Sequence, residues 1–254
     1  MGYLHEGHLS LVKAAIKDCA NVVVTIFINP SQFGPGEDLS SYPLNLSQDI
    51  DMLYCVGADL LWIPTADEMY PEGYQTWVSV EDVTKPLEGA MRSGHFRGVA
   101  TIVAKLFNAV QPQRTYFGQK DAQQAVTIRQ LAKDLNYPID IVICPIIREA
   151  DGLAMSSRNT YLSPAERQAA NVLYRALSSA KDAFTGGEHS ASELRARMQE
   201  IIAGEGLARA QYVSCSDPNT LQELQGDVSN ALLSLAVFIG KTRLIDNMIT
   251  GMKE

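Results

Sequence analysis

Two hydrophobic rhythms alternate over residues 1–145. Segments with apolar residues three or four positions apart alternate with short, almost unbroken apolar runs. The first spacing is typical of helices with one buried face, and the second of strands buried on both faces of a parallel sheet. The alternation therefore predicts an α/β domain with a mostly parallel sheet. We expect helices at 9–19, 47–56, 98–110 and 122–135, and strands at 21–30, 58–64, 114–120 and 139–145.

The pattern changes near Ser163, a helix cap that is followed by Pro164 at the first helical position. Two long helices, at 164–184 and 190–204, are predicted on either side of a Gly-Gly turn, and two strand-like runs follow. This second part is smaller and α+β in type. We place the boundary between residues 144 and 163, and set the domains at 1–147 and 148–254. The two strand-like runs are 210–217 and 231–240.

Composition and charge restrict the classes of partner. The chain has 254 residues, is 46% hydrophobic and carries a formal net charge of −8. Binding to nucleic acid needs a clustered positive surface, so we expect no nucleic-acid partner, whereas a local cationic pocket for a small anion remains compatible. The apolar run at 231–240 is too short to cross a bilayer, and the chain opens without a signal-peptide pattern. Four scattered cysteines without a C-x-x-C pair suit a reducing compartment, so we expect a cytoplasmic protein without a membrane partner.

The opening stretch, "MGYLHEGHLSL", places His5 and His8 on either side of Gly7. We expect a loop that leads into the first turn of a helix, where free N–H groups and the helix dipole favour an anion. Two imidazoles there would supply donors to a phosphate. A zinc site of the H-E-x-x-H type would need one more residue between the histidines, and two surface histidines without a role are the other alternative.

The segment "FINPSQFGPGEDLSSYP" begins at the carboxyl end of an expected strand. Ligands of open α/β sheets bind beyond that end, so Asn29 and Gln32 are well placed to hydrogen-bond a small polar substrate. A plain long loop is the alternative.

The segment "YFGQKDAQQ" repeats this arrangement. Gly118 would allow a close approach, Lys120 can neutralise a phosphate, and Gln123 or Gln124 at the helix start could present an amide to the ligand. Asp121 is equally explained as a simple N-cap.

A third polar segment, "READGLAMSSRN", lies where we expect the two domains to join. A mobile loop that carries Ser156, Ser157 and Arg158 could close over a polyphosphate and stabilise charge as it is displaced. A generic solvated loop is the alternative. The stretch "MRSGHFRGVATIVAKLFN" carries Arg92, His95, Arg97 and Lys105, and we interpret most of these charges as a solvated face. We interpret His189 as a surface residue.

Five motifs occur in one order along the chain: "MGYLHEGHLSL", "FINPSQFGPGEDL", "HFRGVATIVAKLFN", "YFGQKDAQQ" and "READGLAMSSRNTYLS". Together they closely resemble the pantothenate synthetase family, also called pantoate–β-alanine ligases, over essentially the whole chain. The resemblance implies a Rossmann-like nucleotidyltransferase domain with a HIGH-type histidine motif and a KMSKS-type loop. It implies an ATP-dependent condensation of (R)-pantoate with β-alanine to pantothenate, through a pantoyl adenylate, with release of AMP and pyrophosphate. It further implies a homodimer that uses Mg2+.

The resemblance also implies roles for individual residues. The first domain would bind ATP and pantoate, and the second would act as a smaller lid or substrate domain. Gln32 and Gln124 would hold pantoate, Gln32 lying also toward β-alanine, and no side chain is assigned as a metal ligand. The catalytic residues would be His8, the usual proton donor, with His5, Lys120, Ser156, Ser157 and Arg158. ATP would contact Met1, Gly2, Tyr3, Leu4, His5, Glu6, Gly7, His8, Gly118, Gln119, Lys120, Asp121, the backbone of Ile147, Met155, Ser156, Ser157 and Arg158.

Two other functions are considered. One is another nucleotidyltransferase with the same histidine motif, such as a cytidylyltransferase or a fragment of an aminoacyl-tRNA synthetase. The other is a catalytically impaired nucleotide-binding remnant. This alternative arises because family members carry about thirty further residues ahead of the Met-Gly, including a strand whose absence would leave neighbouring strands unpaired and let the phosphate loop fray. A start site chosen too late is our preferred explanation over a shortened chain or a natural variant. We accordingly expect a version extended upstream to be more stable and more active.

Overall fold

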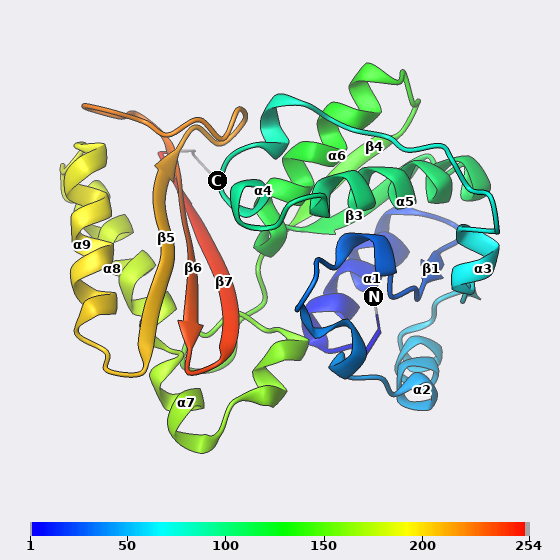
Figure 1. The fold of residues 1–254 in the computed structure, drawn as a ribbon, viewed down its shortest axis with the longest axis horizontal. Helices are drawn as coiled ribbons and strands as arrows, with labels where there is room; N and C mark the ends of the chain where they lie inside the picture. Colours follow the sequence, from blue (N-terminus) through cyan, green and yellow to red (C-terminus); the bar gives the residue numbers. More distant parts are fainter. Residues whose placement is uncertain (1, 252–254) are drawn as a thin grey trace. The chain divides into compact units, whose positions relative to one another are not determined.

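The structure is a computed structural model that describes residues 2–251 (Figure 1). The chain divides into two compact units, which we describe separately. The first unit comprises the described residues up to Gln119 together with Gln123–Pro145, and the second comprises Lys120–Ala122 and the described residues from Ile146 onward. The short Lys120–Ala122 segment, which carries part of the "YFGQKDAQQ" motif, thus groups with the C-terminal part of the chain.

The first unit is an α/β arrangement with parallel strands. Its described strands form two separate parallel pairs, β1 with β2 and β3 with β4. Helices separate the strands along the chain, as expected for parallel connections. In chain order the elements are α1 (Glu6–Asp18), β1 (Val23–Thr25), the 3-10 helices η1 (Pro30–Gln32) and η2 (Asp38–Ser41), α2 (Leu46–Val56), β2 (Leu60–Trp62), α3 (Ala66–Met69), η3 (Asp82–Thr84), α4 (Glu88–Met91), α5 (His95–Val110), β3 (Arg114–Gly118), η4 (Gln119–Asp121), α6 (Ala122–Asp134) and β4 (Asp140–Cys144).

Two apolar clusters hold these elements together. In one, α1 packs against α2 and β1 through residues such as Leu9, Val12 and Leu53. In the other, α5 packs with α6 around Phe107 and Ile128, and side chains of β3 and β4 cover its margin. The helices supply most of the fully buried positions, which fits their apolar residues at three- and four-residue spacing.

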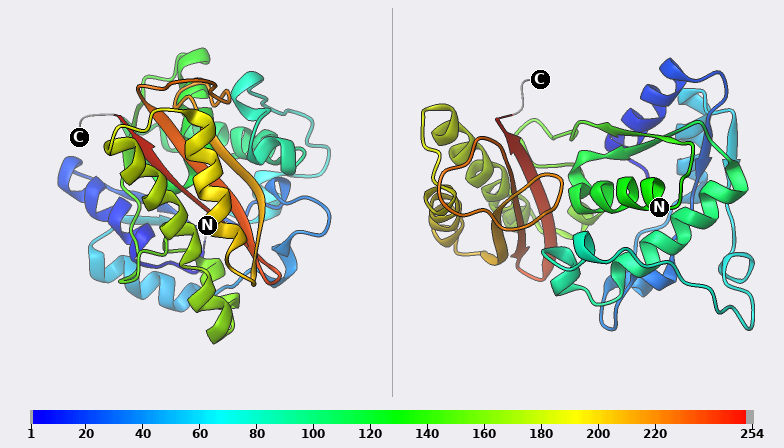
Figure 2. Two further views of the ribbon diagram at one scale, coloured as in Figure 1. Left: turned by 90° about the vertical axis from the view of Figure 1, so that its left-hand side faces the viewer. Right: turned by 90° about the horizontal axis from the view of Figure 1, so that it is seen from above.

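The second unit is a three-stranded antiparallel sheet with two helices on one face. Figure 2 shows α8 and α9 side by side over the strands, and their inward residues, among them Leu177 and Leu194, pack with Leu233 and Leu235 of the central strand β6. The strand order is β5-β6-β7. The elements are η5 (Ser157–Tyr161), α7 (Pro164–Ala169), α8 (Val172–Thr185), α9 (Ala191–Ala203), β5 (Ala208–Ser216), β6 (Ala231–Ile239) and β7 (Thr242–Thr250).

The predicted fold class, a Rossmann-like α/β domain followed by a smaller α+β part, is confirmed, and each expected helix and strand is present. Two details differ. The helix expected over 164–184 is two helices, because the chain turns at Ala170 and Asn171. Strand β7 was not anticipated, since Arg243, Asp246 and Asn247 interrupt its apolar run.

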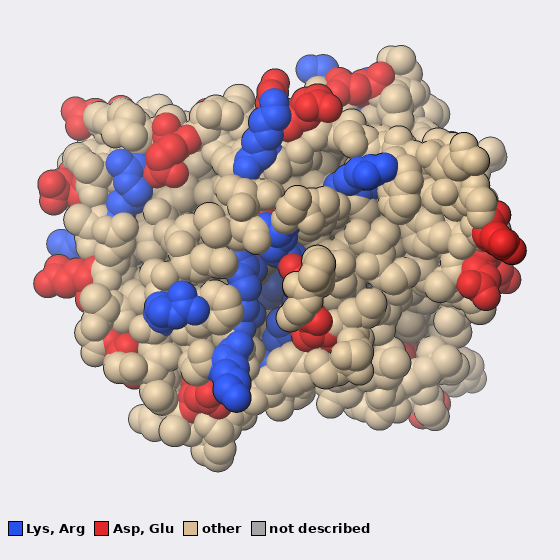
Figure 3. All heavy atoms as spheres, in the orientation of Figure 1, with Lys and Arg blue, Asp and Glu red and all other residues tan. Residues whose placement is uncertain are grey.

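Two properties of the described residues bear on the excluded partners. No helix within residues 2–251 combines the length and the apolar character that crossing a membrane requires. The face drawn in Figure 3 carries both signs of charge with uncharged areas between them, as expected for a chain of net charge −8.

Candidate active site

The histidine motif forms the N-terminal end of α1. His5 is the N-cap residue, and its Nδ1 accepts a hydrogen bond from the Gly7 N–H at 3.1 Å. In return His8 Nδ1 accepts from the His5 N–H at 3.3 Å, so the two side chains satisfy each other's backbone as in a capping box. Their ring centroids lie 4.0 Å apart. The structure thus brings His5 and His8 together where a helix favours an anion.

These contacts decide where the protons of the neutral rings lie. An Nδ1 that accepts a hydrogen bond carries no proton, so the N–H of each neutral imidazole is on Nε2. Both rings therefore combine a structural acceptor with a donor that suits phosphate oxygens. Glu6 lies beside them in the first turn, and its carboxylate pairs with Lys13 at 2.8 Å on the exposed surface.

Asp49 holds the segment that precedes α1. Its buried carboxylate accepts hydrogen bonds from the N–H groups of Tyr3 and Leu4 at 2.8 and 2.6 Å. Tyr3 adopts a positive φ of 56°, a conformation that a non-glycine residue keeps only when its surroundings hold it. We did not identify Asp49 from the sequence, because its partners lie 45 and 46 residues away. Of the predicted ATP contacts, Met1 lies outside the described residues.

The Asn29–Gln32 segment is fixed mainly from within. Asn29 is 2% exposed, and its amide nitrogen donates to Gln32 Oε1 at 3.3 Å and to the Gly98 carbonyl at 3.1 Å. Its amide oxygen accepts from the Tyr70 hydroxyl at 2.8 Å and from Ser31. Because both the oxygen and the nitrogen of its amide are engaged within the protein, Asn29 is a structural residue, and Gln32 is half-buried beside it.

The interpretation of Arg92 and His95 as part of a solvated face was wrong. Arg92 forms a bidentate pair with Glu37 at 2.7 and 2.8 Å and contacts His95 Nε2 at 3.1 Å. The Nδ1 of His95 lies 2.8 Å from the Gln32 carbonyl oxygen and must donate to it, because a carbonyl only accepts. Burial lowers the pKa of His95, and the neighbouring Arg92 charge lowers it further. Arg92 and His95 therefore hold the backbone carbonyl of Gln32 in place.

The other charged residues of that stretch differ in environment. The Arg97 guanidinium stacks over Trp77 at 4.5 Å on the exposed side of α5, whereas Lys105 is half-buried over the Tyr74 ring at 4.6 Å. His189 is exposed and packs edge-on against Phe184 alone among the described aromatic rings, as the sequence predicted for a surface residue.

The "YFGQKDAQQ" motif runs from the end of β3 into α6. A Cβ added at Gly118 would meet no atom of the chain within 4 Å, so the backbone there is open to a close approach. Lys120 is partly buried and lies 3.7 Å from Asp121. Gln123 is buried: its side-chain oxygen accepts a hydrogen bond from the Glu88 N–H, and its side-chain nitrogen donates to the Val83 and Pro86 carbonyls. Gln124, the other candidate, is half-buried, and its side-chain amide makes no hydrogen bond within residues 2–251.

The 148–159 segment is an ordered hairpin rather than a generic loop. Arg148 bridges to Ala154, and the Met155 N–H donates to the Ile147 carbonyl at 3.0 Å. Ser156 then caps the short helix η5, accepting from the Arg158 N–H at 3.3 Å. The fold thereby places Ser156, Ser157 and Arg158 in succession at one helix start.

Ion pairs hold this hairpin from one side. The Arg167 guanidinium of α7 pairs with Glu149 and with Asp151, each at 2.7 Å. The side-chain amide of Asn159 donates to Glu149 at 2.9 Å and to the Ala154 carbonyl at 3.1 Å. The guanidinium beside it holds the pKa of Asp151 below its ordinary value. These ion pairs and hydrogen bonds tie the hairpin to α7 and η5.

The described residues contain no cluster of three or more His, Cys, Asp or Glu side chains suited to a metal ion. Mg2+ usually binds through one or two carboxylates together with substrate phosphates.

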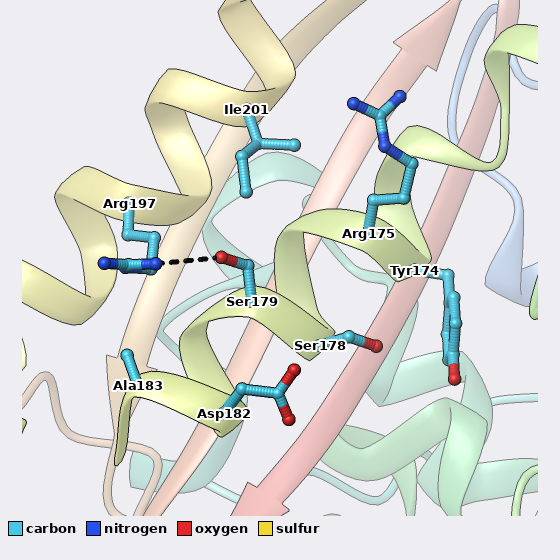
Figure 4. A pocket seen from close by; sticks show the side chains of 8 residues that line it. All are labelled: Tyr174, Arg175, Ser178, Ser179, Asp182, Ala183, Arg197 and Ile201. Carbon is cyan, nitrogen blue, oxygen red and sulfur yellow. Dashed lines mark hydrogen bonds between the residues drawn. The ribbon is translucent and has the colours of Figure 1, made fainter. Parts of the chain in front are cut away.

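A surface hollow in the second unit lies apart from the predicted residues of that unit. It is lined by α8 and α9, where Arg197 donates to Ser179 at 3.2 Å (Figure 4). Tyr174 stands at its edge and carries the Arg148 guanidinium 5.1 Å above its ring. The hollow thus contributes to the hairpin only through Tyr174.

Comparison with known proteins finds matches along nearly the whole chain. A sequence profile described as pantoate-beta-alanine ligase matches residues 1–249. The pantothenate synthetases of Herpetosiphon aurantiacus and Roseiflexus castenholzii are both 56% identical to the chain, over 98% of it and 91% and 90% of their own lengths.

Solved structures give the same result. The pantothenate synthetase of Thermus thermophilus superposes with a TM-score of 0.95 at 47% identity, covering 98% of this chain and 90% of that one. The Francisella tularensis pantoate-beta-alanine ligase complexed with beta-gamma ATP and beta-alanine gives a TM-score of 0.81 at 35% identity, covering 100% and 88%. The chain therefore belongs to the pantoate–β-alanine ligase family and is an enzyme of the ligase class.

Proposed function

We propose that this enzyme joins (R)-pantoate to β-alanine in two steps at the expense of ATP. In the first, a pantoate carboxylate oxygen attacks the α-phosphorus of ATP, the bond to the β-phosphate oxygen breaks, and pyrophosphate leaves. In the second, the amine of β-alanine attacks the acyl carbon of the pantoyl adenylate, the bond from that carbon to the AMP oxygen breaks, AMP leaves, and the nitrogen releases a proton. The products are pantothenate, AMP and pyrophosphate.

The histidine pair carries the proposal. In the first step negative charge moves onto the departing pyrophosphate, and preorganised donors that meet developing charge are the largest single source of rate enhancement in such reactions. His5 and His8 each keep Nε2–H as a donor because Nδ1 is engaged with the backbone. We assign His8 as the proton donor in a hydrogen bond from its Nε2–H to the departing pyrophosphate, with the proton staying on the ring, and His5 as its partner at the phosphates. Glu6 and Gly7 would contribute through the backbone at the start of α1.

The remaining roles follow the chemistry of each residue. Lys120, Ser156, Ser157 and Arg158 supply positive charge and hydroxyl donors to the phosphates. Gln32 and Gln124 hold pantoate, with Gln32 extending to β-alanine. The other proposed ATP contacts are Gly2, Tyr3, Leu4, Gly118, Gln119, Asp121, Ile147 and Met155.

Several coarser assignments belong to the same proposal. Residues 1–147 would bind ATP and pantoate, and 148–254 would act as the smaller lid or substrate domain. We further propose that the protein is a cytoplasmic homodimer and that it uses Mg2+ brought by ATP. The segment from His5 to His8 would be its HIGH-type histidine motif.

The decisive experiment measures all three products with and without each substrate. We expect pantothenate, AMP and pyrophosphate in equal amounts only when ATP, pantoate and β-alanine are all present. With pantoate but without β-alanine, pyrophosphate release should stop near one equivalent per site, since the adenylate remains bound.

The alternatives give other patterns. A nucleotidyltransferase of different specificity would release pyrophosphate with another acceptor and not with pantoate. A nucleotide-binding remnant would bind ATP and release neither product, and either pattern would refute the proposal.

A further inference from the structure

Strand β7 carries a buried polar pair that the reaction described above does not use. Asp246 and Asn247 are 1% and 3% exposed in a strand whose other buried residues are Leu244 and Thr250. A buried carboxylate costs free energy unless it is paired, and an apolar residue of similar size would often stabilise the protein more. The pair therefore calls for an explanation other than packing.

Asp246 is joined to Arg148, the residue that opens the hairpin leading to Ser156. The guanidinium donates to both carboxylate oxygens, at 2.6 and 3.0 Å, in the bidentate geometry of the strongest ion pairs. The same guanidinium donates to the Gly152 carbonyl at 3.0 Å and to the Asn247 carbonyl at 3.3 Å. Arg148, which lies in the first arm of the hairpin, thus links strand β7 to the turn of the hairpin at Gly152.

The turn of the hairpin has little freedom to move away from this link. Gly152 has a φ of 95°, and a Cβ there would collide with the ring of Tyr174. The turn is therefore pressed against α8 while Arg148 lies over the same ring. A shift of Arg148 would move the hairpin and, with it, the start of η5.

Asn247 reaches the other proposed phosphate segment. Its side-chain amide donates to the Lys120 carbonyl at 2.9 Å, across 127 positions of sequence. Successive strand residues point to opposite faces, so adjacent positions of β7 reach two different segments. Burial raises the pKa of Asp246, while the charges of Arg148 and, to a smaller extent, Lys120 oppose that rise. Both basic residues are thus within electrostatic reach of one carboxylate.

We propose that Asp246 and Asn247 are positioning residues of the ATP site, which hold the 148–158 hairpin through Arg148 and the Lys120 segment through its carbonyl. The inference rests on the proposed function in assigning Lys120, Ser156, Ser157 and Arg158 to the phosphates. Neither residue of the pair touches substrate. Their effect is on where the phosphate-binding groups stand.

The test compares Asp246→Asn and Asn247→Ala with wild type. Asp246→Asn keeps the shape and removes the charge, whereas Asn247→Ala removes the hydrogen bond to Lys120. We expect each to raise the Kd and the KM for ATP about tenfold, the value of one lost charge-assisted or buried hydrogen bond. The KM values for pantoate and β-alanine should stay within about twofold, because Gln32 is held by Asn29 and His95 and Gln124 belongs to α6, outside the unit that contains β7.

Matched controls separate positioning from stability. Arg195 pairs with Glu223 at 2.6 Å in the same unit, so Arg195→Lys matches Arg148→Lys at an ion pair remote from the hairpin. Ser234 faces Asn247 across the sheet with a buried hydroxyl that has no partner among the described residues, so Ser234→Ala matches Asn247→Ala. The controls should change the melting temperature at most, whereas Arg148→Lys should weaken ATP binding.

A double variant tests the route. If Asp246 acts through Arg148, Asp246→Asn combined with Arg148→Lys should bind ATP no more than about twofold more weakly than the worse single variant, because both remove one interaction. Unchanged ATP affinity in Asp246→Asn and Asn247→Ala, or an equal loss in the controls, would overturn the inference. Since ATP affinity is measured by calorimetry without turnover, a wild-type protein that makes no pantothenate would refute the proposed function and still decide this point.

Discussion

Backbone groups fix the tautomers of three histidine rings, and the tautomer of His95 is the opposite of that of His5 and His8. His5 and His8 accept N–H groups at Nδ1 and so keep their proton on Nε2, whereas His95 donates from Nδ1 to the Gln32 carbonyl. The first two can offer a donor to a ligand, and the third can only support one. Residue type alone did not separate these roles, since a histidine in a sequence has no tautomer.

The dual use of the histidine rings leads to a prediction about stability and activity. Asn is a preferred N-cap residue and Gln a preferred third residue of a capping box, so His5→Asn and His8→Gln should keep the start of α1 intact. Each removes an imidazole donor, and kcat/KM for pantothenate formation should fall about 100-fold or more. Thermal unfolding should show a melting temperature within about 2 °C of wild type. A parallel loss of melting temperature would mean that the rings act only as caps.

The buried His95 gives a pH dependence. The pKa of His95 is lowered in the folded protein. Below about pH 6.5 the unfolded chain therefore takes up a proton that the folded chain does not, so the folded state becomes less stable as the pH falls. His95→Asn retains a donor for the Gln32 carbonyl but lacks this titration. The melting-temperature gap between wild type and the variant should be widest at about pH 7.5 and should narrow by about pH 5.5. A melting-temperature gap for His95→Asn that stays constant between these two pH values would contradict the argument.

Among the elements, the contact of α5 with η1 determines where Gln32 stands. A Cβ at Gly98 would collide with the carbonyl group of Ser31, so the helix can approach this closely only with glycine at that position. The same carbonyl face of α5 receives the Asn29 amide. The close approach of two backbones, together with the hydrogen bond from His95 to the Gln32 carbonyl, therefore sets how closely η1 lies against α5.

Gly98→Ala tests this contact. Alanine is favoured over glycine inside a helix by about 1 kcal/mol, so a net loss of about 1–3 kcal/mol in unfolding free energy would report the clash. Because the displaced backbone is that of Ser31 and Gln32, the KM for pantoate should rise while the KM for ATP stays nearly constant. Gly206→Ala is the control, since a Cβ there meets no atom within 4 Å. Equal effects of the two variants on the KM for pantoate would count against the role of Gly98.

The sequence predicted elements well where one hydrophobic period persisted. The α1, α5 and α6 helices and the β6 strand follow such patterns. Strand β7 was not predicted because its polar residues Asp246 and Asn247 contact Arg148 and Lys120, which are distant in sequence. Asp49 escaped for the same reason. The motif residues were found because they are local, whereas the residues that hold them are not.

The whole molecule contains separate apolar cores. The cluster of the second unit includes Leu177 and Leu194, and it shares none of its described members with the cluster of α5 and α6 that includes Leu131. Its helices and sheet belong to residues after Ile146. The change of pattern near Ser163 already indicated a differently built second part, but not that Lys120–Ala122 would group with it, because that grouping depends on a three-dimensional contact with β7.

Separate cores predict independent effects of core substitutions. Leu177 and Leu131 are 0% and 1% exposed, so replacing either by alanine should cost about 2–5 kcal/mol of unfolding free energy through lost burial and the cavity left behind. Because the two leucines share no partner, the double variant should lose the sum of the two within about 0.5 kcal/mol. Urea denaturation followed by circular dichroism measures this, and where two transitions are resolved each substitution should shift only one. A deviation from additivity above about 1 kcal/mol would show that the two leucines are energetically coupled.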